Sequence, residues 1–219
     1  MSRPLAVLRP EPGNAATAQA IEALGRRAIR LPLFRIVPLD WDRPPASDHD
    51  ALILTSANAV RQAGAALQTY ATLPVHAVGA ATAAAARAAG LDVVATGDAD
   101  GQALLDAAER AGVRRALLLT ARDRAVAGHP VLHMIRAVYA SEAVDGVDVG
   151  ALHGAVALVH SQRAARQLAM LADDRGAIAV AAIAPAVADA LGTGWQAIAI
   201  AAQPDDSATI AAAIALADA

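Results

Sequence analysis

The sequence contains no cysteine and very few aromatic residues. Its 219 residues include two Trp, two Tyr and one Phe, so aromatic side chains make up 2% of the chain. Without cysteine there is no disulfide, no thiolate nucleophile and no metal site built on sulfur. A core with so few rings is built from Ala, Leu, Ile and Val, which favours helices packed tightly on a buried sheet.

An excess of basic residues is also lacking. Eighteen Lys and Arg residues stand against 21 Asp and Glu residues, which gives a net charge of −3 and a pI near 6.0. Such a chain has no positive field to attract nucleic acid. The first residues lack the long apolar run of a secretion signal, and the most apolar window, residues 178–202, is interrupted by Pro185 and Asp189. We therefore expect a cytoplasmic protein with neither a nucleic-acid nor a membrane partner.

The sequence does contain an internal repeat. Residues 52–61 align with residues 157–166 at an offset of 105, which places Ser56 on Ser161. The same offset, without a gap, places residues 77–83 on residues 182–188. Two copies of one strand–loop–helix plan predict two α/β lobes. A cleft between two lobes is where a ligand usually binds.

Short apolar runs alternate with amphipathic stretches along most of the chain, which is typical of parallel sheets with helices on both faces. The expected fold class is therefore α/β, with two similar lobes, each a parallel sheet with flanking helices, joined by a two-segment linker. The N-terminal strand–helix–strand is too small to form a domain alone. We predict a first lobe of residues 1–36 plus 142–219, and an inserted second lobe of residues 37–141.

Several element boundaries follow from the same patterns. Helices are predicted over residues 15–27 and 57–68, and three prolines between Phe34 and Pro45 mark the first crossing between lobes. Residues 129–135 are interpreted as a shortened helix. Residues 136–139 are then predicted to be the strand that leads back to the first lobe.

Five short motifs occur in a fixed order along nearly the whole chain. They are Val7-Leu-Arg-Pro10, Leu31-Pro-Leu-Phe-Arg-Ile-Val-Pro38, Leu54-Thr-Ser-Ala-Asn-Ala-Val60, Val75-His-Ala-Val-Gly-Ala-Ala-Thr-Ala83 and Val138-Tyr139. In this order they resemble the uroporphyrinogen-III synthase family. The resemblance implies two α/β lobes joined by a two-stranded linker, with the first lobe made of both termini.

The resemblance also implies a function. Members of the family are cyclising hydro-lyases of tetrapyrrole (haem) biosynthesis, which convert hydroxymethylbilane to uroporphyrinogen III with inversion of the last pyrrole ring and loss of water. The expected partner is thus a small linear tetrapyrrole with eight carboxylates. No metal or organic cofactor is needed for this reaction, and a monomer is expected.

The sequence departs from the family's pattern in three places. The segment from Thr120 to Gly128 is short where relatives carry a Gly-rich turn and a full helix. Ala184-Pro-Ala-Val187 replaces a turn similar to Gly-Pro-Thr-Thr, and His160-Ser161 replaces the usual Thr-Ser. These departures affect loops rather than strands, so they bear on catalysis more than on fold.

Two residues have the chemistry to act on the substrate directly. Tyr139 matches the family's Tyr at the returning crossing, and its phenol can donate a proton to the departing hydroxide. The alternative is a boundary side chain that packs one lobe on the linker. Arg9 follows the first strand and can pair with a substrate carboxylate, whereas its alternative is a surface salt bridge.

Four further candidates are predicted to bind the substrate. Ser56, Thr82 and Ser161 follow strands, where free backbone N–H groups at helix starts bind anions. The alternative for each is simple N-capping, and capping and binding can coexist. Asn58 shares the turn of Ser56.

Two other functions remain open at this point. A two-lobed binding protein without catalysis would have the same fold, because fold does not determine function. A degenerate cyclase relative that only binds its ligand would also fit the altered turns. The product formed from hydroxymethylbilane separates these alternatives.

Overall fold

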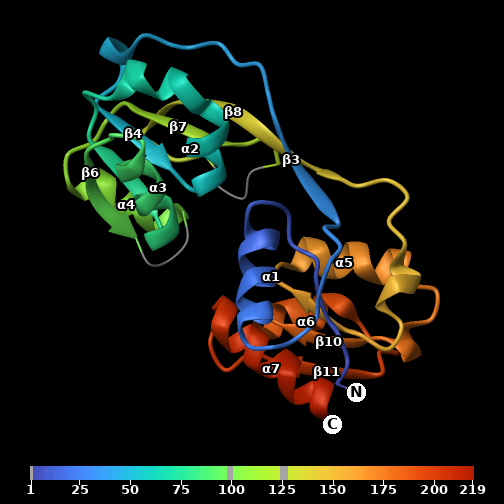
Figure 1. Ribbon diagram of the computed structural model, residues 1–219. Helices are drawn as coiled ribbons and strands as arrows, with labels where there is room; N and C mark the ends of the chain where they lie inside the picture. Colours follow the sequence, from blue (N-terminus) through green and yellow to red (C-terminus); the bar gives the residue numbers. More distant parts are fainter. Residues whose placement is uncertain (1, 98–100, 124–127) are drawn as a thin grey trace. The chain divides into compact units, whose positions relative to one another are not determined.

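The computed structural model describes residues 2–97, 101–123 and 128–219 of the chain. The chain divides into two compact units, shown in Figure 1. Unit 1 consists of Met1–Arg35 and Glu142–Ala219, and unit 2 consists of Ile36–Ser141. Each unit is a layer of strands covered by helices, so the α/β fold class expected from the sequence is confirmed.

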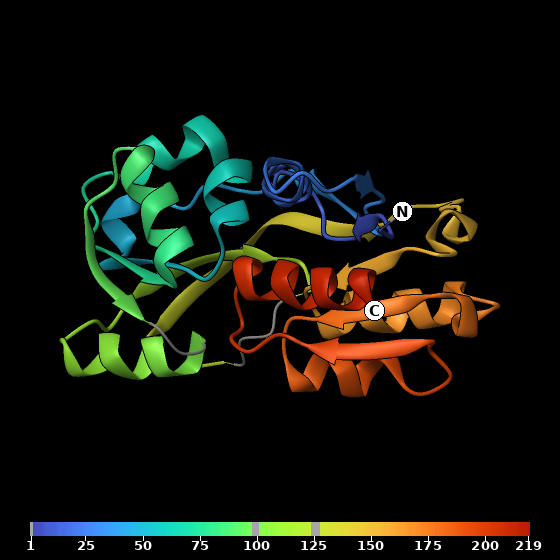
Figure 2. The same cartoon turned by 60° about the horizontal axis from the view of Figure 1, so that its bottom comes forward.

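Unit 1 is built on a five-stranded sheet in the order β11-β10-β9-β1-β2, with every neighbouring pair parallel. Helices α5 and α6 pack on one face and α1 and α7 on the other (Figure 2). Alternate strand residues are buried on opposite faces, as in β1, where Ala6 contacts the first cluster and Leu5 and Val7 the second. The strands are β1 Leu5–Val7, β2 Ala28–Arg30, β9 Val156–Val159, β10 Ala179–Ala182 and β11 Ala197–Ile200; the helices are α1 Gly13–Ala23, α5 Gln162–Leu171, α6 Pro185–Leu191 and α7 Asp206–Asp218, with 3-10 turns at Val149–Leu152 and Arg175–Ala177.

Unit 2 contains a sheet in the order β3-β8-β7-β4-β5-β6, of which β8, β7, β4, β5 and β6 run parallel. Helices α2 and α3 cover one face, and α4 covers the other with Leu104, Leu105 and Ala108. The strands are β3 Phe34–Pro38, β4 Ala51–Leu54, β5 Val75–Val78, β6 Val93–Gly97, β7 Ala116–Ala121 and β8 Leu132–Ala143; the helices are α2 Ala57–Ala63, α3 Ala80–Ala88 and α4 Gly101–Arg110, with 3-10 segments at Ala46–Asp48 and Gly64–Tyr70.

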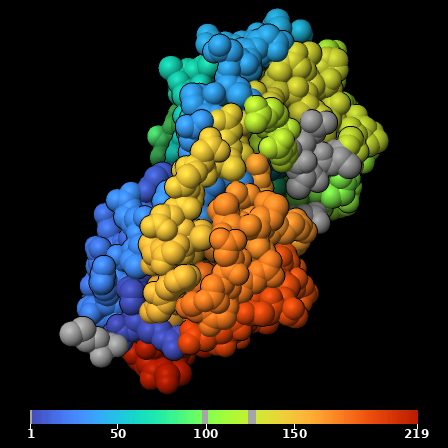
Figure 3. Space-filling view, turned by 90° about the vertical axis from the view of Figure 1, so that its right-hand side faces the viewer, coloured from blue at the N-terminus to red at the C-terminus, as the bar shows by residue number. Residues whose placement is uncertain are grey.

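The chain leaves unit 1 along β3 and returns along β8. These two strands are neighbours that run in opposite directions, because the Leu39 N–H donates to the Val138 carbonyl and the Val144 N–H to the Leu33 carbonyl, both at 3.0 Å. In Figure 3 the returning segment, coloured yellow, lies at the surface beside blue residues of the outgoing one. The two crossings of the predicted linker are thus paired strands.

The two units repeat one plan. Strands β11, β10, β9, β1 and β2 of unit 1 correspond in order to β6, β5, β4, β7 and β8 of unit 2. Ser56 and Ser161, aligned by the sequence repeat, are the N-cap residues of α2 and α5. Helix α1 of unit 1 has no counterpart in the described residues between β7 and β8. Residues 124–127 of the shortened segment 120–128 lie outside the described residues.

The shortened helix predicted over residues 129–135 is wrong. Leu132–Ala143 is a single strand of 12 residues. Val131 and Ile135 are four residues apart, a spacing compatible with a helix. Pairing of this segment with β7 on one side and β3 on the other satisfies its backbone groups, so tertiary context overrides the local pattern.

Two other predicted helices are shorter than expected, each because of a glycine with positive φ. Helix α2 ends at Ala63, since Gly64 has a φ of 55° and a 3-10 segment follows. Helix α1 ends at Ala23, two residues before Gly25, whose φ is 72°. Leu24, the residue that follows α1, is 59% exposed. None of the helices in the described part of the chain is long and apolar enough to cross a membrane.

Candidate active site

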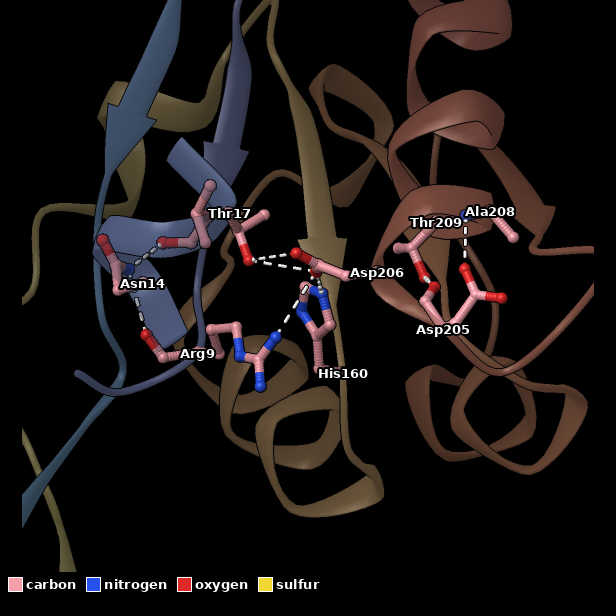
Figure 4. A network of polar contacts seen from close by, with 9 residues as sticks. Arg9, Asn14, Thr17, His160, Asp205, Asp206, Ala208 and Thr209 are labelled. Carbon is pink, nitrogen blue, oxygen red and sulfur yellow. Dashed lines mark hydrogen bonds and ion pairs between the residues drawn. The ribbon is translucent and has the colours of Figure 1, made fainter. Parts of the chain in front are cut away.

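In both units the predicted site residues lie at the carboxyl edge of the sheet, where the carboxyl ends of parallel strands meet. Open α/β sheets bind their ligands at this edge. In unit 1, Arg9 follows β1, and His160 and Ser161 follow the neighbouring strand β9. Helix α7 begins at Asp206. The structure brings Arg9, His160 and Asp206 into one polar network at this edge, shown in Figure 4.

Asp206 is the common acceptor of that network. Its Oδ1 accepts from His160 Nε2 at 2.8 Å, from Thr17 Oγ1 at 3.0 Å and from Arg9 Nη1 at 3.4 Å. Its Oδ2 accepts from Thr17 Oγ1 at 2.8 Å. Figure 4 shows the three donors converging on this carboxylate from three different segments of the chain. The surface salt bridge considered for Arg9 is thus present, with Asp206 as its partner.

The network determines the ionisation of Asp206. Partial burial raises the pKa of this carboxyl, but hydrogen bonds from His160 and Thr17 and the charges of His160 and Arg9 outweigh it and lower the pKa below its usual range. Asp206 is therefore an anion at neutral pH. A carboxylate that accepts from several donors is fixed in orientation, and it fixes its donors in turn.

Asn14 holds the loop that carries Arg9. It is fully buried, and its side-chain amide donates to the Val7 carbonyl at 2.7 Å and to the Arg9 carbonyl at 2.9 Å. Its own carbonyl accepts from Arg30 Nε at 3.1 Å. The backbone on both sides of the β1 end is therefore anchored to α1, which sets where the Arg9 side chain begins.

Ser161 lies at the same edge as the N-cap of α5. Its Oγ accepts from the Ala164 N–H at 3.1 Å, and the residue is exposed. Asp205, next to Asp206, caps α7 in the same way by accepting from the Ala208 N–H at 2.7 Å. The capping alternative considered for Ser161 is thus realised, and the exposed hydroxyl is still accessible to a ligand.

In unit 2 the carboxyl edge carries hydroxyl and amide groups. Ser56 caps α2 by accepting from the Asn58 N–H at 3.1 Å, and Asn58 Oδ1 accepts from Arg61 Nη1 at 3.0 Å. Thr55 follows β4, and its hydroxyl lies 3.4 Å from that of Thr120 on the neighbouring strand β7. These groups form short local contacts rather than one shared network.

Thr82 is not a cap. It lies in the first turn of α3 and is 4% exposed, while the N-cap position is held by Gly79 with a φ of 78°. Gly79 has no side chain with which to cap this helix. The first N–H groups of a helix can bind an anion, so a ligand-binding role for this turn stays a prediction.

Tyr139 lies on β8, opposite Ala121, the last residue of β7. Its carbonyl accepts from the Arg122 N–H at 2.8 Å, and its side chain packs in the apolar cluster under α2 and α3 with 8% exposure. Among the described residues its hydroxyl has no hydrogen-bond partner. The ring packs in the core, as the packing alternative requires, and the role of the phenol as an acid stays a prediction.

Sequence reasoning missed Thr17, His160 and Asp206 as members of one site. One signal was available, because Asn14 and Thr17 are polar residues on the buried face of a helix that also carries Ala18 and Ile21. In the sequence, His160 stands out only as a departure from the family's pattern. No group of three or more His, Asp or Glu side chains within the described ranges has the geometry to hold a metal ion.

The family model described as Uroporphyrinogen-III synthase HemD matches residues 15–127, which is more than half of the chain. The chain belongs to this family. A search of curated proteins found no match. The resemblance stated from five short motifs is thereby confirmed, and so is the function it implied, that of a uroporphyrinogen-III synthase in tetrapyrrole biosynthesis.

Solved structures support the fold. Uroporphyrinogen-III synthetase from Helicobacter pylori matches with a TM-score of 0.67 at 15% identity, covering 98% of this chain and 99% of that one. A mutant uroporphyrinogen III synthase from Thermus thermophilus matches with a TM-score of 0.55 at 18% identity, covering 94% and 95% of the two chains. At such identities the likeness concerns the fold. It extends over nearly the whole length of both relatives.

Proposed function

We propose that this chain is a hydro-lyase that closes hydroxymethylbilane to uroporphyrinogen III without a cofactor. The observation that carries the proposal is the family match over residues 15–127. The polar groups at both carboxyl edges are consistent with it, because the substrate bears eight carboxylates and a hydroxyl that must leave. Nothing in the fold or the comparisons favours the non-catalytic alternative.

The reaction is a dehydration with formation of carbon–carbon bonds, and its atoms balance without an oxidant. The C–O bond of the hydroxymethyl group breaks, the hydroxide takes up a proton, and water leaves an electrophilic azafulvene. The substituted carbon of the last pyrrole attacks this centre to give a spiro intermediate. In the rearrangement, the bond between the spiro carbon and the methylene bridge to the preceding ring breaks, and the bridge bonds instead to the unsubstituted α carbon of the last ring. This exchange inverts the last ring, and loss of the proton from that α carbon restores the aromatic pyrrole. Because the linear compound also closes spontaneously to the wrong isomer, positioning is the main task of the protein.

Tyr139 is proposed as the acid that assists the departing hydroxide. The β8 strand pairs with β7 at this point and fixes the ring, which is packed in the core with its hydroxyl unbonded within the described residues. A rigid ring with an unbonded phenol can direct one proton to one place. General acid catalysis of this kind contributes about 10²–10⁴-fold to a rate.

The remaining predicted residues are proposed to bind substrate carboxylates. Arg9 offers a guanidinium fork at the edge of unit 1. Ser56 and Ser161 offer hydroxyls at the starts of α2 and α5, Asn58 adds an amide, and Thr82 lies beside the uncapped N–H groups of α3. Hydroxyls and backbone N–H groups are neutral, so each binds a carboxylate weakly. A substrate with eight carboxylates can be held by many such weak contacts.

The test is to mix purified protein with freshly prepared hydroxymethylbilane and to separate the product isomers after oxidation. Type III product formed faster than spontaneous closure supports the proposal. Type I product alone, at the spontaneous rate, would leave only a binding role.

We also propose a monomeric enzyme of the cytoplasm, in line with the family in general; light scattering during gel filtration checks the monomer.

A further inference from the structure

The three donors to Asp206 are not equally tightly bound. His160 and Thr17 contact it at 2.8–3.0 Å, whereas Arg9 lies at 3.4 Å, beyond the usual N–H···O distance. Oδ1 is shared by all three donors. The contact to Arg9 is therefore the weakest of the set and the easiest to exchange for another acceptor.

The position of the Arg9 guanidinium is set by more than this contact. A Cβ atom built on Gly13 would lie 2.5 Å from Arg9 Nε and 2.8 Å from Arg9 Cζ. The guanidinium thus rests against Gly13, where a side chain would collide with it. The side chain remains 36% exposed, and a guanidinium has five N–H donors, of which Asp206 engages one.

His160 and Thr17 make such an exchange possible. When Arg9 turns to another carboxylate, Asp206 keeps its hydrogen bonds to both of these side chains, so its charge is not left buried and unpaired. The His160 side chain is 7% exposed, and its Nδ1 has no partner in the described part of the chain. An unsatisfied buried nitrogen costs stability, so this histidine is poorly explained by stability alone.

We propose that Asp206 is a positioning residue for substrate binding, which presents the Arg9 guanidinium at the carboxyl edge of unit 1 to one carboxylate of the substrate. This inference rests on the proposed function. In the free protein, the 3.4 Å contact with Asp206 holds the Arg9 guanidinium in place. On binding, the substrate carboxylate takes Arg9, and His160 and Thr17 retain Asp206. Asp206 thus contributes to substrate binding and takes no part in the chemical steps that follow.

The proposal predicts a change in KM rather than in kcat. Asp206→Asn keeps the shape and the contact with Thr17, but it removes the charge that orients Arg9. We expect KM for hydroxymethylbilane to rise about three- to tenfold, as for the loss of one ordinary hydrogen bond, because Arg9 remains but is no longer oriented, with kcat nearly unchanged. Asp205→Asn is the matched control. It removes the same charge one residue away and keeps the helix cap, because Asn caps as well as Asp, so it leaves both constants unchanged.

A double-mutant cycle separates positioning from a general loss of structure. Arg9→Gln alone should raise KM at least as much as Asp206→Asn. The double variant should then be no worse than Arg9→Gln, because Asp206 acts through Arg9. Simple instability would instead lower the active fraction, and so kcat, in proportion to the loss of folded protein seen by circular dichroism.

Gly13→Ala is a second test of the same role, and it removes no polar side chain of the Asp206 network. Alanine suits the first turn of α1, but its methyl group must displace the Arg9 guanidinium. We expect a stable protein with raised KM. If wild-type protein forms no type III product, the proposed function fails and this inference falls with it. If wild-type protein is active and Asp206→Asn and Gly13→Ala both keep the wild-type KM, the positioning role alone is overturned.

Discussion

The two units share a strand order but differ at their carboxyl edges. In unit 1, Thr17 of α1, His160 after β9 and Arg9 after β1 all donate to a single carboxylate, that of Asp206 at the start of α7. In unit 2, Ser56 and Asn58 bond within the first turns of α2, and the Thr55 hydroxyl contacts that of Thr120 on β7. The Tyr139 hydroxyl has no partner among the described residues. Helix α1, which has no described counterpart in unit 2, supplies the difference because it carries Asn14 and Thr17.

The two carboxyl edges therefore differ in rigidity. A shared network fixes its members in one geometry. Separate hydroxyls adjust at little cost. One copy of the repeated fold thus carries a rigid charged edge, and the other carries a more adaptable polar edge.

The largest effect is expected from Tyr139→Phe. Loss of the phenolic proton should lower kcat by up to about 10²–10⁴-fold, with residual activity from positioning. Stability should hardly change, because the ring stays in the core and the hydroxyl has no described partner. Steady-state kinetics and thermal unfolding of the same preparation check both parts. A stable and fully active variant would reduce Tyr139 to a packing residue.

The second prediction compares two buried threonines in stability. Thr17→Val removes both hydrogen bonds to Asp206 from a fully buried site and should cost about 1–3 kcal/mol of unfolding free energy. Thr82→Val has the same change of shape at a buried site in unit 2, where the hydroxyl has no described hydrogen bond, so its effect should stay within about 0.5 kcal/mol. Urea unfolding measures both. Equal costs would mean that the unit 1 network adds no stability.

The third prediction concerns acid. Burial lowers the pKa of His49 and His76 in unit 2, so the unfolded chain binds protons there that the folded chain does not. Stability should therefore fall as pH drops below about 6.5, the usual pKa of histidine. The pKa of Asp206 in unit 1 is also lowered, but its contribution is retained until the pH falls below about 4, near the usual Asp value.

His76→Leu sharpens this test. His76 is 4% exposed and its Nδ1 is unpaired among the described residues, so Leu removes the titration without removing a bond at that nitrogen. The unfolding free energy of the variant should depend less on pH between 5 and 7 than that of wild type. Hydrogen exchange should show the first loss of protection at low pH in β4 and β5. An unchanged pH dependence would mean that His76 is not the source.

The sequence predicted the repeated strand–loop–helix units better than it predicted the contacts between side chains. The offset of 105 correctly paired Ser56 with Ser161, because local patterns define strand–loop–helix units. Arg9 was identified as a candidate because it follows a strand. Its partner Asp206 lies 197 residues away, and the strand order that brings them together is not written in any local pattern. The segment over 129–135 was misassigned for the same reason, since pairing on both sides decides its structure.

The smallest effect is expected where the two units are alike. Ser56→Ala and Ser161→Ala each remove one N-cap hydrogen bond of 3.1 Å, and each should cost about 1 kcal/mol of unfolding free energy. Ser→Gly at the same positions should cost only a few tenths of a kcal/mol, because glycine also suits an N-cap. If Ser161→Ala costs clearly more than Ser56→Ala in urea unfolding, the hydroxyl of Ser161 supports the Asp206 edge as well as α5. Equal costs would confine the difference between the units to the residues that α1 and α7 contribute.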